Sequence, residues 1–197
     1  LAKKLGMGAA LWDIGDGVLC LEFTSKMNSL DFFTMKMINR ACDMIGDGKG
    51  KYKALVIHNE GEMFSAGANL GVAVMAIKAK QYWIVDQMVR LGQEAYKRLK
   101  YAPFPVVSAP SGMAFGGGCE ILLHSSHVQA HAETYTGLVE VGVGLLPAWG
   151  GSTELLTRAH QRQKDGKLAG GPMPPVATVF ETISTAKVCA SAQDGKD

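Results

Sequence analysis

The sequence lacks a strong excess of charge of either sign. It has 20 Lys and Arg residues against 18 Asp and Glu residues, which gives a formal net charge of +2. The basic residues are scattered along the chain and form no stripe. Proteins that bind nucleic acid or an anionic membrane through charge need a concentrated basic surface. We therefore expect neither nucleic acid nor a membrane as a partner.

Long apolar runs are also missing. No run approaches the roughly 18 residues that a membrane-spanning helix needs. The first residues, LAKKLGMGAALWDIGDG, have no apolar core before their acidic residues, so they do not resemble a secretory signal peptide. The chain begins with Leu1 and ends in ASAQDGKD. We interpret it as a piece of a longer protein.

Cysteine and nucleotide-binding motifs are sparse. The four cysteines, Cys20, Cys42, Cys119 and Cys189, show no C-x-x-C spacing, so we expect them to be reduced and the protein to be cytoplasmic. The G-x-G-x-x-G motif of dinucleotide-binding loops does not occur. We expect this chain to hold no cofactor and no metal.

The residues that are present favour one compact α/β domain. Hydrophobic residues make up 47% of the chain, which also has 24 glycines. Two strands, AALWDI and GVLCLEF, are predicted to form a hairpin, and a helix is predicted to follow with Ser29 as N-cap and Gly46 as its end. Further strands are predicted in KALVIHN, PVVSAP and HVQAHA, and helices over residues 71–101 and in GGCEILLHSS. Strands that alternate with helices indicate βαβ units and a parallel sheet.

The composition also suggests a division of the chain. Residues 1–160 are predicted to form the core, and residues 161–175, rich in Lys, Gly and Pro, a linker or exposed loop. Residues 176–197 are predicted to be a helical segment that is incomplete.

Two glycine-rich loops follow buried strands in the same way. FSAGAN comes after the strand that ends near Asn59, and GMAFGGGCE comes after the strand that ends near Ala109. Ligands collect beyond the carboxyl ends of parallel strands. Glycines there let two backbones approach one ligand atom, and two N–H groups aimed at it would form an oxyanion hole. The simpler interpretation, that both loops are only tight turns, is weakened by the carboxylate of Glu120 beside the second loop.

Three other patterns point to different chemistry and are weaker. His124, His127 and His131 have a spacing that resembles metal ligands, but the first would end a helix while the others lie on a strand. Ser65 lies in a sequence close to a nucleophile elbow, without the required first glycine and without an identifiable histidine partner. The sequence GDGKGK lacks the Ser or Thr of a phosphate-binding loop and is predicted to be an exposed turn.

Four motifs occur between about Ala10 and Arg158: NSLD, FSAGANL, GMAFGGGCEILL and TYTGLVEVGVGLLPAWGG. In their order and separations they together resemble the crotonase (enoyl-CoA hydratase/isomerase) superfamily. The sequences ETYTGLVEVGVGLLPA and FETISTAKVCASA most resemble the crotonase domain in the carboxyl half of a bifunctional 3-hydroxyacyl-CoA dehydrogenase. The resemblance implies a crotonase-like ββα spiral, an acyl-CoA substrate and a homo-oligomer of the family's trimer type. It places NAD only in an upstream dehydrogenase part.

The resemblance also assigns the site. It implies an oxyanion hole formed by the N–H groups of Ala68 and Gly117. It implies a pair of catalytic carboxyls on Glu120 and Glu140, 20 positions apart, with Glu120 activating water and Glu140 delivering the α-proton. The substrate and CoA contacts that it implies are Ser65, Ala66, Gly67, Leu70, Gly116 and Pro147. Trp149 is bulkier than the family's usual residue and is predicted to reshape the acyl pocket.

The activity predicted from these residues is hydration of a trans-2-enoyl-CoA to a 3-hydroxyacyl-CoA in fatty-acid β-oxidation. Two alternatives remain open at this stage. An isomerase of the same fold would usually keep the glutamate at Glu140 but not the one at Glu120. A non-catalytic module that binds CoA thioesters would need neither carboxyl.

Overall fold

The computed structural model describes residues 3–5 and 8–196. Its strands pair into two sheets, a larger one in the order β1-β2-β3-β4-β6-β8 and a smaller one in the order β5-β7-β9. The strands are β1 (Lys3–Leu5), β2 (Ala9–Asp13), β3 (Val18–Phe23), β4 (Ala54–Ile57), β5 (Met63–Ser65), β6 (Val106–Ser108), β7 (Gly112–Phe115), β8 (His127–Val128) and β9 (Thr134–Gly137).

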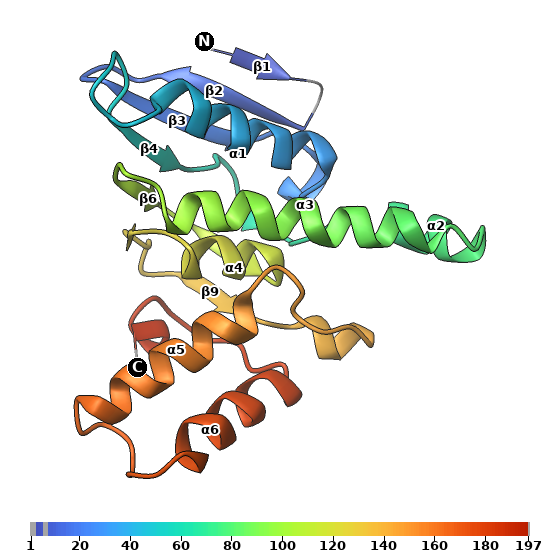
Figure 1. Ribbon diagram of the computed structural model, residues 1–197, viewed down its shortest axis with the longest axis vertical. Coiled ribbons are helices and arrows are strands. Elements are labelled where there is room, and N and C mark those ends of the chain that lie inside the picture. The colour runs from blue at the N-terminus through green and yellow to red at the C-terminus, as the bar shows by residue number, and fades with distance from the viewer. Residues whose placement is uncertain (1–2, 6–7, 197) are drawn as a thin grey trace.

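The helices are the α-helices α1 (Phe32–Ile45), α2 (Leu70–Lys78), α3 (Tyr82–Lys100), α4 (Gly117–Leu123), α5 (Gly151–Lys164) and α6 (Met173–Ser184), and the 3₁₀ helices η1 (Lys26–Asn28), η2 (Glu140–Val143) and η3 (Asp194–Lys196). Along the long axis of the molecule, β2, β3 and α1 lie at one end and α5 and α6 at the other (Figure 1).

One structural pattern repeats after β3. A strand of the larger sheet is followed by a strand of the smaller sheet and then by a helix: β4, β5 and α2 with α3, then β6, β7 and α4, then β8, β9 and α5 after η2. Each of these strands pairs in parallel with its neighbours from the other repeats. This arrangement confirms the predicted α/β fold with a ββα spiral. It also brings the loops that follow the strands to one region of the molecule.

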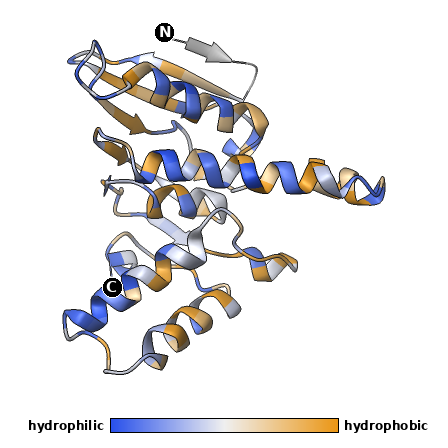
Figure 2. Cartoon of the chain, viewed as in Figure 1, coloured by the Kyte–Doolittle hydropathy of each residue, from blue (hydrophilic) through white to orange (hydrophobic). Residues whose placement is uncertain are grey.

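One cluster of buried side chains joins α1, α3 and the larger sheet and forms the core. Along β3, buried side chains alternate with partly exposed ones, so that Leu19 and Leu21 point inward, as expected of a pleated strand with one covered face. From α1, Met37 and Ile38 are fully buried, and α1 packs on β2, β3 and α3. Figure 2 shows hydrophobic and hydrophilic residues alternating along α3, as expected for a helix with one buried face.

The predicted N-cap of α1 was wrong by two residues. The cap is Asp31, whose carboxylate accepts from Phe33 N and Thr34 N at 2.9 Å each, while Asp31 N donates to Thr34 Oγ1. This capping box uses an acidic side chain that also favours the positive end of the helix dipole. Ser29 instead ends η1. The predicted end of the helix at Gly46 is confirmed.

The helix predicted over residues 71–101 is broken in two. Lys80 has a φ of 57°, and Gln81 N donates to Ala76 O at 2.8 Å, which closes a turn between α2 and α3. Neither glycine nor proline marks this break, so the sequence pattern did not reveal it. As a result, α2 is a short helix that begins directly after the loop FSAGAN.

The smaller sheet is the main feature that the sequence did not predict. Its strands β5 and β7 lie inside the two segments predicted as loops, and β9 lies beyond HVQAHA. The interval 161–175, predicted as a linker, contains the end of α5 and the start of α6. The division of the chain into a core, a linker and a C-terminal segment stays a prediction.

Candidate active site

The two glycine-rich loops touch one another backbone to backbone. Gly67 has a φ of 86°, and a Cβ added there would lie 2.9 Å from the carbonyl oxygen of Phe115 and 3.0 Å from the nitrogen of Gly117. A Cβ at Gly118 would lie 2.8 Å from the carbonyl oxygen of Ser65. A side chain at either glycine would force the loops apart. The glycines therefore allow a close approach of the two loops, while the predicted approach of both backbones to one ligand atom stays a prediction.

Two N–H groups of these loops, those of Ala68 and Gly117, are not used by the local secondary structure. Ala68 is bridged to Leu30, with Leu30 N donating to Gly67 O and Asn69 N donating to Leu30 O, both at 2.8 Å. Because residues along an extended segment alternate in direction, the N–H of Ala68 points away from Leu30. Gly117 is the first residue of α4, where an N–H has no acceptor within the helix. Both N–H groups can therefore donate to a ligand.

The carboxyl of Glu120 is buried and held in place by backbone. Glu120 is 1% exposed, and its Oε1 accepts from Trp149 N at 2.9 Å and from Gly151 N at 2.8 Å. Burial is the largest effect on this group and raises the pKa of Glu120 to about 7, against the lowering effect of the two N–H donors. At neutral pH this carboxyl therefore lies near the midpoint of its titration, as suits a group that exchanges a proton.

A second carboxyl, that of Glu140, lies near enough to Glu120 for its charge to act on it. A Cβ added at Gly116 would lie 3.2 Å from Glu140 Oε1, so this carboxyl lies against the backbone that precedes Gly117. Among the described residues, the Oε2 of Glu140 is buried with no hydrogen-bond partner, and burial raises the pKa of Glu140. The charge of Glu140 also contributes to the raised pKa of Glu120. An unpaired buried carboxyl oxygen is costly unless a proton or a ligand satisfies it.

The raised pKa of Glu120 predicts a specific pH dependence of stability. The folded protein titrates this group near 7 instead of the ordinary 4.5. Between those values the folded state binds the proton and the unfolded state does not, so the free energy of unfolding falls as pH rises. Glu120→Gln removes this titration. Thermal melts across the window should show the Tm of the wild-type protein dropping relative to that of the variant, whereas a constant Tm difference would contradict the shift.

The remaining predicted contacts lie around this pair of loops. Ser65 is fully buried, and its hydroxyl donates to Asn28 O at 2.8 Å and accepts from Gly67 N at 3.1 Å. Ala66 N donates to Met27 O at 3.2 Å. The structure therefore uses Ser65 and Ala66 to hold the loop. Leu70 is exposed at the start of α2, and Pro147 is half-buried between η2 and α5.

The sequence did not reveal what holds Glu120. The donors are the N–H groups of Trp149 and Gly151, about 30 positions further along the chain, and a backbone donor has no sequence signature of its own. Trp149, predicted to reshape the acyl pocket, is 7% exposed, and its indole packs in the core against Tyr96. The run of two glycines after Trp149 was the available signal, because Gly150 has a φ of 109° and turns the chain toward Glu120.

The three histidines do not meet. His124 is buried, and its Nδ1 is 2.7 Å from the carbonyl oxygen of Glu120, which makes this nitrogen the donor. His127 and His131 are exposed. Within residues 3–5 and 8–196, no group of three or more His, Cys, Asp or Glu side chains could hold a metal ion. In the same residues, no helix is long and apolar enough to cross a membrane.

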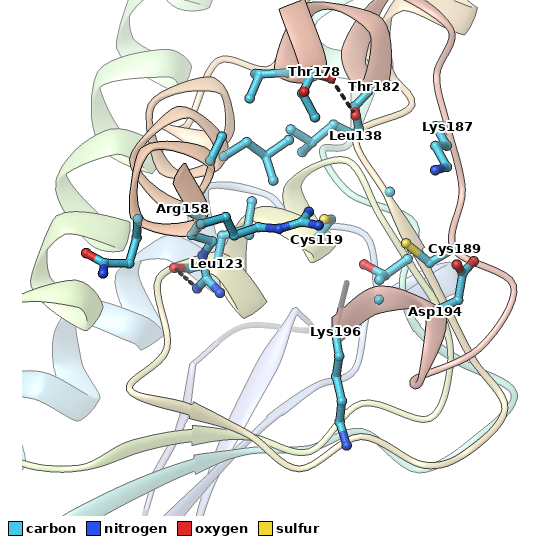
Figure 3. A pocket seen from close by; sticks show the side chains of 18 residues that line it. Cys119, Leu123, Leu138, Arg158, Thr178, Thr182, Lys187, Cys189, Asp194 and Lys196 are labelled. Carbon is cyan, nitrogen blue, oxygen red and sulfur yellow. Dashed lines mark hydrogen bonds between the residues drawn. The ribbon is translucent and has the colours of Figure 1, made fainter. Parts of the chain in front are cut away.

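A cavity of about 470 Å³ lies between α4, β9, α5, α6 and η3. None of the predicted site residues lines it. Cys119 and Cys189 lie on its wall, and Arg158 reaches across to donate to Leu123 O at 3.0 Å (Figure 3). The predicted site residues therefore do not form the wall of this cavity.

The sequence matches known proteins along most of its length. The sequence model of the enoyl-CoA hydratase/isomerase family matches residues 13–168. A Bacillus subtilis protein named "probable 3-hydroxyacyl-CoA dehydrogenase" is 42% identical over 96% of this chain and 23% of its own length. A Rickettsia felis protein named "putative fatty acid oxidation complex trifunctional enzyme" is 39% identical over 69% of this chain and 18% of its own length. The chain thus spans less than a quarter of these relatives.

Solved structures share the fold. An enoyl-CoA hydratase from Bacillus anthracis superposes with a TM-score of 0.77 at 21% identity, over 96% of this chain and 66% of that one. A putative enoyl-CoA hydratase from Streptomyces coelicolor gives a TM-score of 0.77 at 19% identity, over 100% of this chain and 66% of that one. The fold and the match over residues 13–168 agree, and the chain belongs to the enoyl-CoA hydratase/isomerase family.

Proposed function

We propose that this chain is an enoyl-CoA hydratase, which adds water to a trans-2-enoyl-CoA to give a 3-hydroxyacyl-CoA. The observation that carries the proposal is one buried carboxyl, Glu120, and one partly buried carboxyl, Glu140, near two N–H groups that the local secondary structure does not use. One carboxyl, Glu120, is fixed by backbone donors, and the other, Glu140, has a buried oxygen without a partner among the described residues. Water addition needs two proton-transfer groups and a place for negative charge.

The N–H groups of Ala68 and Gly117 would bind the thioester oxygen. As water adds to the β-carbon, negative charge moves from the double bond to this oxygen, and two preorganised donors stabilise it. Donors of this kind are worth roughly 3 to 4 kcal/mol each in enzymes where one has been removed. The contact between the loops at Gly67 keeps the donors close to one another.

The carboxyls would divide the proton transfers. Glu120 accepts a proton from the attacking water, whose oxygen bonds to the β-carbon, and Glu140 gives a proton to the α-carbon. Burial raises the pKa of both groups, and the pair favours a single shared proton. Glu120 carries the larger shift, to about 7. For this reaction the proton that the pair shares must lie on Glu140 when water attacks, so that Glu120 is free to accept the proton of the water.

The acyl chain would lie against α2. This helix begins two residues after Ala68, and its first residue, Leu70, is 38% exposed. Val74 and Ile77, about one and two helical turns further, are 48% and 47% exposed, so they extend the apolar face away from the oxyanion donors. Figure 2 shows hydrophobic residues along this projecting helix.

Crotonyl-CoA tests the proposal directly. The purified chain should decrease the absorbance of the enoyl thioester as the conjugated double bond is hydrated. A binding module would bind the thioester without this loss. An isomerase would instead raise the same absorbance when given a 3-enoyl-CoA. Glu120 favours the hydratase over the isomerase, because moving a double bond needs only one carboxyl as a proton shuttle.

The named relatives suggest where the reaction belongs. A 3-hydroxyacyl-CoA is the substrate of a 3-hydroxyacyl-CoA dehydrogenase, which is the name of the Bacillus subtilis relative. We therefore propose that the chain is the hydratase part of such a fusion in fatty-acid β-oxidation, cytoplasmic and oligomeric.

The same proposal assigns no cofactor to this chain. With NAD and 3-hydroxybutyryl-CoA, the purified chain should give no NADH fluorescence, because the sequence has no G-x-G-x-x-G loop. The same assay with a known 3-hydroxyacyl-CoA dehydrogenase is the positive control. Turnover to NADH by the chain itself would show that it contains the oxidising site.

A further inference from the structure

The three glycines at positions 116–118 leave the backbone around Gly117 without side chains of its own to anchor it. Glycine is the most permissive residue in backbone conformation, so a donor N–H placed among glycines needs restraint from elsewhere. Helix α3 supplies a restraint. Tyr96 is fully buried, and its hydroxyl donates to Gly117 O at 2.8 Å.

Trp149 reinforces this contact from a second direction. A Cβ at Gly117 would lie 2.5 Å from Cζ3 of the indole, and one at Gly92 would lie 2.2 Å from its Nε1. The ring therefore lies between the backbones of α3 and α4. The rings of Tyr96 and Trp149 meet edge to face, with centroids 5.4 Å apart. We call these two side chains the aromatic support.

We propose that the aromatic support positions the oxyanion hole, with Tyr96 as its polar contact; this inference rests on the hydratase function proposed above. The carbonyl that accepts from Tyr96 belongs to the same residue as the donor N–H. The hydrogen bond from Tyr96 holds the peptide unit that follows the Gly117 Cα, and the indole packs against that Cα. Both contacts limit how far the preceding peptide unit, which carries the Gly117 N–H, can turn. Oxyanion holes act through such preorganisation.

The Tyr96 hydroxyl is protonated at neutral pH and donates its proton to the carbonyl oxygen of Gly117. Burial, and then the nearby carboxyls of Glu120 and Glu140 and the thiol of Cys119, keep the pKa of Tyr96 well above its usual value of 10. The hydroxyl therefore keeps its proton at the neutral pH where Glu120 titrates, and its hydrogen bond to the Gly117 carbonyl is present in both protonation states of that carboxyl.

Tyr96→Phe tests the contact, because it keeps the ring against Trp149 and removes only the hydroxyl. We expect kcat for crotonyl-CoA to fall about fivefold to tenfold, as for loss of one hydrogen bond, with KM changed less than about twofold. The red shift in absorbance of bound cinnamoyl-CoA, which reports polarisation of its carbonyl, should shrink. Tyr101→Phe is the matched control, since Tyr101 is 75% exposed at the end of α3.

The outcomes separate this inference from the proposed function. Wild-type protein that does not hydrate crotonyl-CoA overturns both. Active wild-type protein with an unchanged red shift in folded Tyr96→Phe overturns the positioning role alone, even if kcat falls. If Tyr96→Phe does not fold, Trp149→Phe decides the question, because it withdraws the indole from Gly117. An undiminished shift in that variant also rejects the aromatic support.

Discussion

Replacing Glu120 with Gln should lower kcat for crotonyl-CoA hydration by at least about 100-fold, with little change in substrate affinity. The reason is that the amide cannot accept a proton from water. The shape of the site should survive, since a Gln side-chain oxygen can accept the same two hydrogen bonds from Trp149 N and Gly151 N. Steady-state hydration assays measure kcat, and a binding titration with a CoA thioester measures the affinity.

Stability distinguishes this variant from one that is merely damaged. Because the folded protein holds Glu120 with a pKa of about 7, ionising it costs folding energy, and Glu120→Gln should be more stable than wild type above that pH, by about 1 to 3 kcal/mol. Glu133→Gln makes the same charge change at an exposed position and should alter neither activity nor this pH dependence. Near-normal turnover by Glu120→Gln would exclude Glu120 as the base.

The sequence singled out those residues of the candidate site that can be recognised by their type. Glycine is required where Gly67 approaches Gly117, and a glycine triplet is rare enough to be recognised in a chain. The carboxyls of Glu120 and Glu140 are side-chain features with a fixed spacing, and in the structure Glu140 lies against Gly116 and its charge acts on Glu120. Their catalytic roles stay a prediction.

The parts that the sequence did not reveal depend on backbone and on distant contacts. The strands β5, β7 and β9 are three or four residues long, and β7 begins with Gly112. Such short segments carry too few side chains to show a period of two. They form because each pairs with a strand from another ββα repeat. The donors to Glu120 were missed for the same reason, because they are peptide N–H groups brought in by the third repeat.

The site is therefore assembled from all three repeats. The first repeat supplies the loop with Ala68, and the second supplies Gly117 and Glu120. The third supplies Glu140 and the donors at Trp149 and Gly151. Since each repeat places its short strand in the smaller sheet, the pairing β5-β7-β9 sets the relative positions of these groups. A change that shifts one short strand should affect the donors and the carboxyls together.

Removing the N–H of Gly117 should strongly reduce the polarisation of a bound thioester, because only the N–H of Ala68 then remains. Proline is the substitution that removes an N–H, and the first residue of a helix tolerates it. The structure shows an obstacle, since any Cβ at this position would lie 2.5 Å from the indole of Trp149. The test therefore requires a smaller side chain at position 149, and Trp149→Leu removes the indole.

Two double variants then differ only in the donor and in the ring that replaces it. In the Trp149→Leu background, Gly117→Ala keeps the N–H and Gly117→Pro removes it. We expect the proline variant to have a kcat lower by about 10² to 10³-fold than the alanine variant, as for other lost oxyanion donors. The red shift of bound cinnamoyl-CoA should persist with alanine and shrink strongly with proline, provided that circular dichroism shows both proteins folded. Equal shifts in the two would mean that a donor other than Gly117 N–H binds the thioester oxygen, since both variants carry the same Cβ and the same loss of the indole.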